Sequence, residues 1–395
     1  SFWEIEALQF ISCMVSLVIY LIFVYSFNSK LKYYFILQGL TLIANSIDVS
    51  WYFMGLEDFK KTVTKNIIVK ILTIILIFLL VKNKNDLGIY IILLNLAIMG
   101  GNITLWPYLK HSIKWIGIKK WKPLKHFYSS LLLFIPSITT QVYVIVNKLM
   151  LGKISGQTAL GEFDYADRIV KLVLALVTSV GMVMLPHIAN RFSHGDIKSI
   201  NQSIYKSFDF VTFASFPLMF GLMAVSQKFA PWFLGSGYVE TGKIIFLEAP
   251  MIVFVSWSTV TGTQYLVPVK RVREYTISVG IGAVVNIVMN LLLLNALAAK
   301  GAALATVISE FTIAILQCTM IKSSISLHIL FKEIWKYFLS GIIMFTLVAL
   351  ISNQIKMSFL SLIFEAVIGI VVYIFFILLF DAQIIKQFKN IMRVR

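Results

Sequence analysis

The chain has 395 residues, of which 59% are hydrophobic and 13% are charged, and its formal net charge is +17 at pH 7. Soluble domains carry about 25% charged residues, so this composition cannot cover a water-facing surface and excludes an ordinary soluble protein. The lysines and arginines lie in short loops between apolar stretches rather than in one patch. This distribution is typical of a multi-pass membrane protein and argues against nucleic-acid binding.

Apolar stretches of roughly twenty residues recur along the chain, and each is long enough as an α-helix to cross about 30 Å of hydrocarbon. Barrel strands would need only about 9–11 residues with alternating polarity, so the pattern predicts an all-α membrane protein. We predict about twelve transmembrane helices, near residues 5–27, 33–54, 64–81, 87–108, 128–150, 167–186, 208–233, 243–265, 274–297, 301–321, 336–352 and 358–380.

The basic residues divide unevenly between the two sets of loops. Of the 35 lysines and arginines, 22 lie in the loops after even-numbered spans or in the C-terminal tail, and 9 lie in the opposite loops. Positively charged loops are retained in the cytoplasm. The sequence therefore predicts a multi-pass protein of the cell membrane with both termini in the cytoplasm.

Two stretches of the chain share an order of features and indicate an internal repeat. The first runs Ser50-Trp51, Gly55, Lys60-Lys61 and Gly88, and the second runs Ser256-Trp257, Gly262, Lys270-Arg271 and Gly301. Their equal orientation is that of a parallel repeat about an axis along the membrane normal. In this register Ser1 corresponds to the start of the seventh span, so we expect a complete protein to carry two further spans before it.

Three bases near the fifth and sixth spans are candidates for holding a diphosphate, which needs several donors at once. These are Lys148, Arg168 and Lys171. Two alternatives remain open. Lys148 could extend its ammonium group to the membrane surface. Asp164–Arg168 and Asp167–Lys171 are i,i+4 acid–base pairs that could satisfy the other two bases without a ligand.

Two acids within predicted spans, Asp48 and Glu310, are candidates for coupling or gating, because a buried carboxylate can take up a proton. A structural hydrogen bond between helices is the alternative interpretation of both. No catalytic constellation and no metal-ligand cluster stands out, and no phosphate-binding glycine loop is present. The sequence thus indicates a transporter rather than an enzyme, with no cofactor and no metal.

Several motifs resemble those of bacterial polysaccharide repeat-unit flippases, which are Wzx-like proteins of the polysaccharide transporter family. The segment from Asp48 to Lys61 is similar to the one that follows the fourth span of that family. Later segments also resemble it, namely Leu133–Ser137, Asn147–Gly152, Met184–His187 and Phe233–Tyr238. The order of these motifs along most of the chain carries the resemblance.

The resemblance implies the fold of the multidrug/oligosaccharidyl-lipid/polysaccharide (MOP) exporters, in which two six-helix lobes surround a central cavity. On this basis residues 1–120 would form an incomplete N-terminal lobe (helices 3–6 of the family), residues 121–330 the C-terminal lobe, and residues 331–395 an accessory helix pair with a cytoplasmic tail. The family's first two helices would be missing.

The resemblance also implies a function in the bacterial plasma membrane. The substrate would be an undecaprenyl-diphosphate-linked oligosaccharide, moved from the inner to the outer leaflet by alternating access for capsule, O-antigen or exopolysaccharide assembly. Cationic cavity residues would hold the diphosphate, and Lys148, Arg168 and Lys171 are the nearest candidates. The lipid bilayer and polysaccharide polymerase machinery are the implied partners. Two alternatives stay open: a cation-coupled multidrug or small-molecule exporter of the same fold, and a membrane-bound polysaccharide polymerase.

Overall fold

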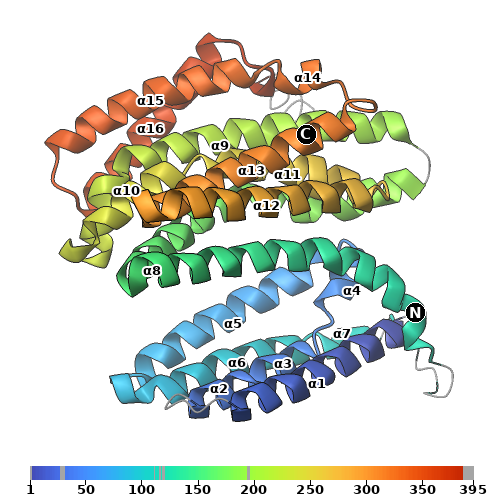
Figure 1. Ribbon diagram of the computed structural model, residues 1–395. Helices are drawn as coiled ribbons and strands as arrows, with labels where there is room; N and C mark the ends of the chain where they lie inside the picture. The colour runs from blue at the N-terminus through green and yellow to red at the C-terminus, as the bar shows by residue number, and fades with distance from the viewer. Residues whose placement is uncertain are drawn as a thin grey trace. The chain divides into compact units, whose positions relative to one another are not determined.

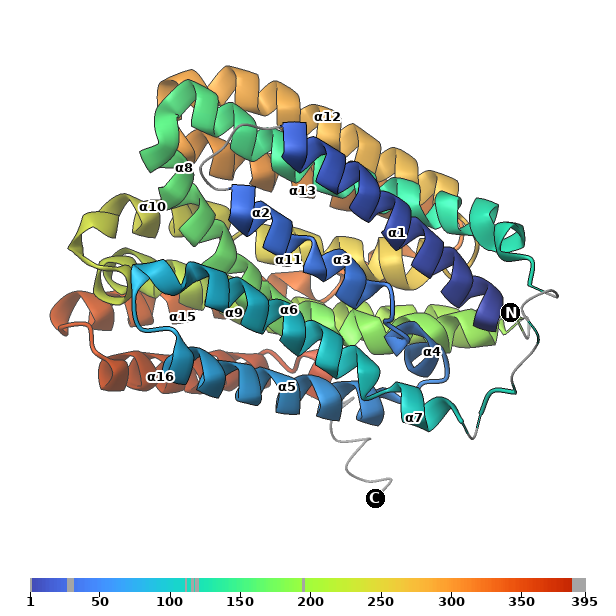
Figure 2. The ribbon, with the colours of Figure 1, turned by 90° about the horizontal axis from the view of Figure 1, so that it is seen from below.

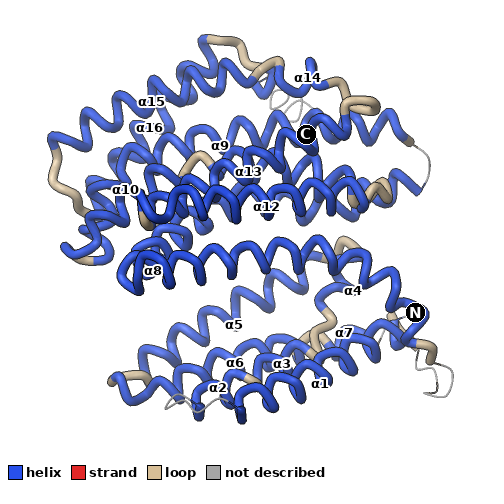
Figure 3. The backbone as a smooth tube through the Cα atoms, in the orientation of Figure 1, coloured by secondary structure: helices blue, strands red, loops and turns tan. Residues whose placement is uncertain are grey.

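The computed structural model describes residues 2–26, 32–110, 112–114, 117, 121–193 and 196–385, and these residues form helices and turns with no strand among them (Figure 3). Helix contacts divide the chain into two compact units, Ser1–Leu132 and Leu133–Arg395. The all-α fold class is therefore confirmed. The lobe boundaries expected near residues 120 and 330 stay predictions.

The first unit is built around α6. Its elements are α1 (Phe2–Ser26), α2 (Lys32–Gln38), α3 (Leu40–Asn45), α4 (Ser50–Gly55), α5 (Phe59–Leu80), the short turn η1 (Lys84–Asp86), α6 (Leu87–Ile103), α7 (Trp106–Leu109) and the turn η3 (Pro123–His126). α6 packs against α2, α3 and α5, and α1 packs against α2 and α3 (Figure 1). A small buried cluster of Val49, Phe53, Leu105 and Leu109 joins α4 to α7.

The second unit surrounds the long helix α9. Its elements are α8 (Phe127–Ser193, which begins in the last residues of the first unit), α9 (Ile197–Leu234), η4 (Ser236–Tyr238), α10 (Val239–Glu248), α11 (Met251–Ser258), the π-helix η5 (Thr259–Leu266), α12 (Val272–Leu297), α13 (Ala299–Ile321), α14 (Leu327–Phe331), α15 (Ile334–Gln354) and α16 (Phe359–Leu379). α9 packs against α10, α11, α15 and α16, and α12 pairs along its length with α13.

Eight described helices are long and apolar enough to cross a membrane, and a bent pair, Ser236–Glu248 with Met251–Leu266, makes a ninth. Three predicted spans remain. The span at 33–54 lies in α2–α4, and the spans at 128–150 and 167–186 lie in α8, one on each side of a break at Gly156, and are called its two arms below. Apolar side chains on these helices are widely exposed; Phe78 is 74% exposed and Leu360 is 77% exposed. Such surfaces are stable against lipid and not against water.

The span predicted at residues 33–54 is not one continuous helix, and this is a correction to the expected pattern. α2, α3 and α4 follow one another with breaks at Gly39 and at residues 46–49. At the second break the carboxylate of Asp48 accepts hydrogen bonds from the backbone N–H of Ser50, at 2.9 Å, and from its hydroxyl, at 2.5 Å. A short polar side chain that bonds to nearby backbone competes with the helix ladder and favours a new helix start.

The span predicted at residues 243–265 is also bent, by 44° between α10 and α11. Pro250 lies at this bend. Proline has no N–H to donate and its ring clashes with the preceding turn, so the helix changes direction there.

Candidate functional site

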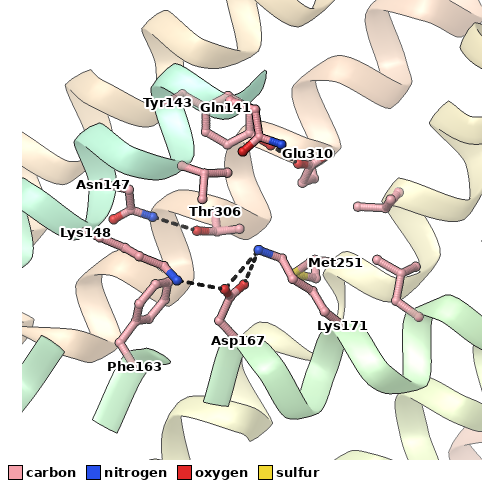
Figure 4. Close-up of a pocket in the computed structure, with 13 residues that line it drawn as sticks. Gln141, Tyr143, Asn147, Lys148, Phe163, Asp167, Lys171, Met251, Thr306 and Glu310 are labelled. Atoms are coloured by element: carbon pink, nitrogen blue, oxygen red, sulfur yellow. Dashed lines mark hydrogen bonds and ion pairs between the residues drawn. The ribbon is translucent and has the colours of Figure 1, made fainter. Parts of the chain in front are cut away.

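A pocket of about 370 Å³ lies in the second unit, between the two arms of α8 and the helices α11 and α13 (Figure 4). Charged, polar and apolar side chains share its wall. The lining residues are Gln141, Tyr143, Val144, Asn147, Lys148, Phe163, Asp167, Lys171, Leu174, Met251, Val255, Thr306 and Glu310.

The pocket exists because α8 is folded back at Gly156. This glycine has φ 89° and ψ 171°, in the positive-φ region that residues with a side chain rarely adopt. In an unbroken helix Lys148 and Asp164 would lie about 24 Å apart, at 1.5 Å per residue. In the structure their side chains form an ion pair at 2.5 Å. The kink therefore brings the two arms against each other.

One carboxylate, that of Asp167, serves two lysines at the centre of the pocket. Lys171 Nζ lies 2.7 Å from Asp167 Oδ1 and 2.9 Å from Oδ2, and Lys148 Nζ lies 3.6 Å from Oδ2. Figure 4 shows both ammonium groups directed at this carboxylate. The Asp167 side chain is only 6% exposed, so its charge depends on these two lysines for compensation.

The three predicted bases are not equivalent in the structure. Lys148 and Lys171 line the pocket, whereas Arg168 does not, and its side chain is 72% exposed. Arg168 Nε pairs with Asp164 Oδ2 at 2.8 Å. Both i,i+4 ion pairs that the sequence suggested, Asp164–Arg168 and Asp167–Lys171, are therefore present. A role of these bases toward a ligand stays a prediction.

Of the two acids predicted for coupling or gating, only Glu310 lines this pocket. Its side chain is buried in α13 and accepts a hydrogen bond of 2.6 Å from the hydroxyl of Tyr143 in α8. Nearby, Asn147 donates to the hydroxyl of Thr306 at 3.1 Å, a second link between the same two helices. Asp48 lies in the first unit, where its carboxylate accepts from the N–H of Ser50, the first residue of α4.

Sequence reasoning gave no site role to two acids near the lysines. Asp167 was considered only as the partner of Lys171, and its position at the centre of the pocket depends on the kink of α8. Glu248, the last residue of α10, is fully buried and interacts electrostatically with Asp167 and Lys171. Neither of its carboxyl oxygens has a hydrogen-bond donor among the described residues. The sequence signal for Glu248 was its place inside the span predicted at residues 243–265, because acids within membrane spans are rare and commonly functional.

Two family models match the chain. Residues 3–192 match the model described as "Polysaccharide biosynthesis protein". Residues 153–372, more than half of the chain, match the model described as "Lipid II flippase MurJ". The two matches overlap in the second arm of α8, which carries Asp167 and Lys171.

Curated relatives of both kinds are similar to the chain. A protein assigned as an O-antigen transporter of Shigella dysenteriae is 23% identical over 78% of this chain and 77% of its own length. The lipid II flippase MurJ of Bacillus subtilis is 28% identical over 40% of this chain, and the match spans 29% of that protein. Among solved structures, a lipid II flippase MurJ in an inward closed conformation matches with a TM-score of 0.67 and 18% identity, covering 95% of this chain and 83% of that one. That structural match is a likeness of fold.

Proposed function

Because this chain belongs to the flippases of the MOP exporter superfamily, which include the Wzx-like polysaccharide flippases and the lipid II flippases, we propose that it moves a lipid-linked oligosaccharide from one leaflet of the membrane to the other. The substrate is an undecaprenyl-diphosphate-linked repeat unit, transferred from the inner to the outer leaflet of a bacterial plasma membrane for capsule, O-antigen or exopolysaccharide assembly. The relatives named for O-antigen and lipid II transport support this substrate class.

The observation that carries the proposal is the pair of lysines on one carboxylate in the pocket of the second unit. A diphosphate head group cannot cross hydrocarbon unaided, since burying its charge without partners costs many kcal/mol. Lys148 and Lys171 supply two ammonium groups from different arms of α8. Charge-assisted hydrogen bonds of this kind are about twice as strong as neutral ones, so a phosphate placed between them is well compensated.

Asp167 gives the site a way to release its ligand. Asp167 pairs with Lys171 at 2.7 Å and lies 3.6 Å from Lys148, and a phosphate oxygen between the two lysines would take its place. Lys148 also keeps a shorter ion pair, with Asp164 at 2.5 Å. Binding is then an exchange of one anion for another, and release returns Asp167 to its two partners. A transporter requires that the ligand-bound and ligand-free states of its site differ little in free energy, because a site that only binds tightly does not complete a cycle.

Alternating access completes the proposed mechanism. The lipid tail stays in the bilayer while the head group occupies a polar cavity, and rocking of one lobe against the other changes the side from which that cavity opens. Polysaccharide polymerase machinery is the partner that would receive the unit on the outer side.

The proposal is tested in two settings. In a strain that lacks the gene, lipid-linked repeat units should accumulate on the inner leaflet, and unchanged levels would contradict the proposal. In proteoliposomes, the double variant Lys148→Gln/Lys171→Gln should lower transfer of a lipid-diphosphate oligosaccharide by at least about tenfold, because each lost charge-assisted contact is worth about 1.5–3 kcal/mol.

Arg168→Gln is the matched control, since it removes a base from the same helix but outside the pocket. It should retain most of the transfer rate. If the double variant transports lipid-linked sugar normally but loses export of an organic cation that the unchanged chain and Arg168→Gln retain, the cation-coupled exporter is the better interpretation.

A further inference from the structure

A second pocket, of about 450 Å³, lies in the first unit at the beginning of α5. Figure 2 shows α4 and α7 at this end of α5. One wall of the pocket is formed by the first turns of α5, with three lysines, and the other by residues 104–108, which include part of α7. The polar residues of the two walls are Lys60, Lys61, Thr64, Lys65, Thr104 and Tyr108.

The three ammonium groups are compensated to different degrees. Lys61 pairs with Asp58 at 2.8 Å and lies over the rings of Phe53 and Tyr108. Lys65, which is half-buried, donates to Ser50 Oγ at 3.2 Å and to Asn102 Oδ1 at 3.1 Å. The carboxylate of Asp48, which accepts from the same Ser50 hydroxyl, also interacts with Lys65 electrostatically. The exposed Lys60 has no hydrogen bond or ion pair with any residue that the structure describes.

The position of these lysines is unfavourable for the helix itself. The first turn of α5 contains Lys60 and Lys61 and no acid, and Asp58 makes no capping hydrogen bond with its side chain. A helix N-terminus carries a partial positive charge, so cations there destabilise the helix and an anion stabilises it. The N-cap residue Asp58 supplies one carboxylate here, paired with Lys61, so a bound anion would chiefly compensate Lys60 and the helix end.

The repeat in the second unit provides the comparison. There the basic pair Lys270-Arg271 lies just before α12, and Arg271 pairs with Glu274 at 2.9 Å. Lys61 of the first unit likewise pairs with one acid, Asp58. The polar contacts that join η5, α12 and α13 are between neutral groups: Thr261 donates to Gln317 at 2.9 Å, and Gln317 donates to Ser278 at 3.1 Å. The second unit thus joins these helices through neutral groups, whereas the first unit places the ammonium group of Lys65 between Ser50 and Asn102.

We propose that the pocket at the start of α5 binds a phosphate group, and that the phosphate is the head group of an anionic lipid. Lys60, Lys61 and Lys65 would share its oxygens, with the hydroxyl groups of Thr64 and Tyr108 at the same wall. The base distribution places this end of α5 at the cytoplasmic surface, where anionic lipid is concentrated. The proposal concerns a site separate from the pocket of the second unit and does not depend on the proposed transport function.

The test measures binding to the full chain in detergent by native mass spectrometry, with dioctanoyl phosphatidic acid, inorganic phosphate and dioctanoyl phosphatidylcholine as probes. The double variant Lys60→Gln/Lys61→Gln should bind phosphatidic acid about tenfold more weakly than the unchanged chain, as expected for the loss of one to two charged contacts. Lys60→Arg/Lys61→Arg keeps the charge and should restore most of the affinity.

Lys270→Gln/Lys322→Gln is the matched control, because it removes two bases from loops of the second unit. Its affinity for phosphatidic acid should stay within about twofold. If the affinity for inorganic phosphate falls in Lys60→Gln/Lys61→Gln as much as the affinity for phosphatidic acid, the phosphate site is supported and its ligand is free phosphate. Unchanged affinity for phosphatidic acid in Lys60→Gln/Lys61→Gln, or an equal loss in the control, would overturn the proposal. None of these measurements depends on transport, so their outcome is independent of the test of the proposed flippase function.

Discussion

Asp167 holds two ammonium groups that come from opposite arms of α8, at 2.7 Å from Lys171 and 3.6 Å from Lys148. The sequence indicated its pair with Lys171, because four residues make one turn of a helix and place both on one face. The contact with Lys148 could not be predicted, because it depends on where the backbone folds back. A side chain that looked like a local helix-stabilising acid is therefore the centre of the candidate site.

Asp167→Asn provides a test of the exchange of anions. We expect this variant to bind a lipid diphosphate on the order of tenfold more tightly and to transport it more slowly, since the competing carboxylate is gone while the side-chain shape is kept. Equilibrium binding and transfer in proteoliposomes measure the two effects.

Glu240→Gln is the control for Asp167→Asn. Glu240 also serves two lysines, Lys243 at 2.6 Å and Lys300 at 2.8 Å, but on an exposed surface. Its replacement should alter neither binding nor transfer, because exposed ion pairs contribute only about 0–1 kcal/mol. Weaker binding by Asp167→Asn would mean that Asp167 maintains the pocket rather than competing with the ligand.

Helix packing in the second unit depends on small residues where backbones approach closely. At the contact of α12 and α13, a Cβ added to Gly282 would lie 2.3 Å from Ile313 Cγ1, and Ser309 of α13 donates a 2.7 Å hydrogen bond to the carbonyl of Gly282. Close approach at glycine together with hydrogen bonds between helices is how membrane helices associate, because lipid provides no hydrophobic force between them.

Gly282→Ala should therefore lower the thermal stability of the chain, by about 1–3 kcal/mol, the usual cost of overpacking. Gly280→Ala on the same helix is the control, since nothing lies within 4 Å of its added Cβ. That change should be neutral or stabilise by about 0.5–1 kcal/mol, as alanine for glycine does within a helix. Equal melting temperatures for the two variants would contradict the close contact.

Broken helices were harder to predict than continuous ones. The apolar run at residues 33–54 indicated one span, yet α3 ends at Asn45 and α4 begins at Ser50, whose N–H bonds to the carboxylate of Asp48. The bend at Pro250 follows from the missing N–H of proline, but its size, 44°, is set by packing. Hydropathy reports that a segment is buried in lipid and not whether its backbone is continuous.

Across the full chain, the distribution of bases predicts which loops face the cytoplasm. In a background with Cys13→Ser and Cys318→Ala, a cysteine at Ser324 should be protected from a membrane-impermeant maleimide in intact cells. A cysteine at Lys356 should be labelled. Both positions are exposed, so access is decided by the side of the membrane. Labelling of Ser324→Cys with protection of Lys356→Cys would invert the predicted orientation.

The membrane class, the all-α architecture and the approximate positions of the helices were determined by the sequence alone, because they depend on composition and on runs of neighbouring residues. The ion pairs Asp164–Arg168 and Asp167–Lys171 belong with them, since helical periodicity is local. The site itself was decided by tertiary structure. The hydrogen bond from Tyr143 to Glu310 joins residues 167 positions apart, and the kink at Gly156 brings Lys148 to the acids of the other arm. Such contacts depend on the path of the backbone, which neither hydropathy nor periodicity specifies.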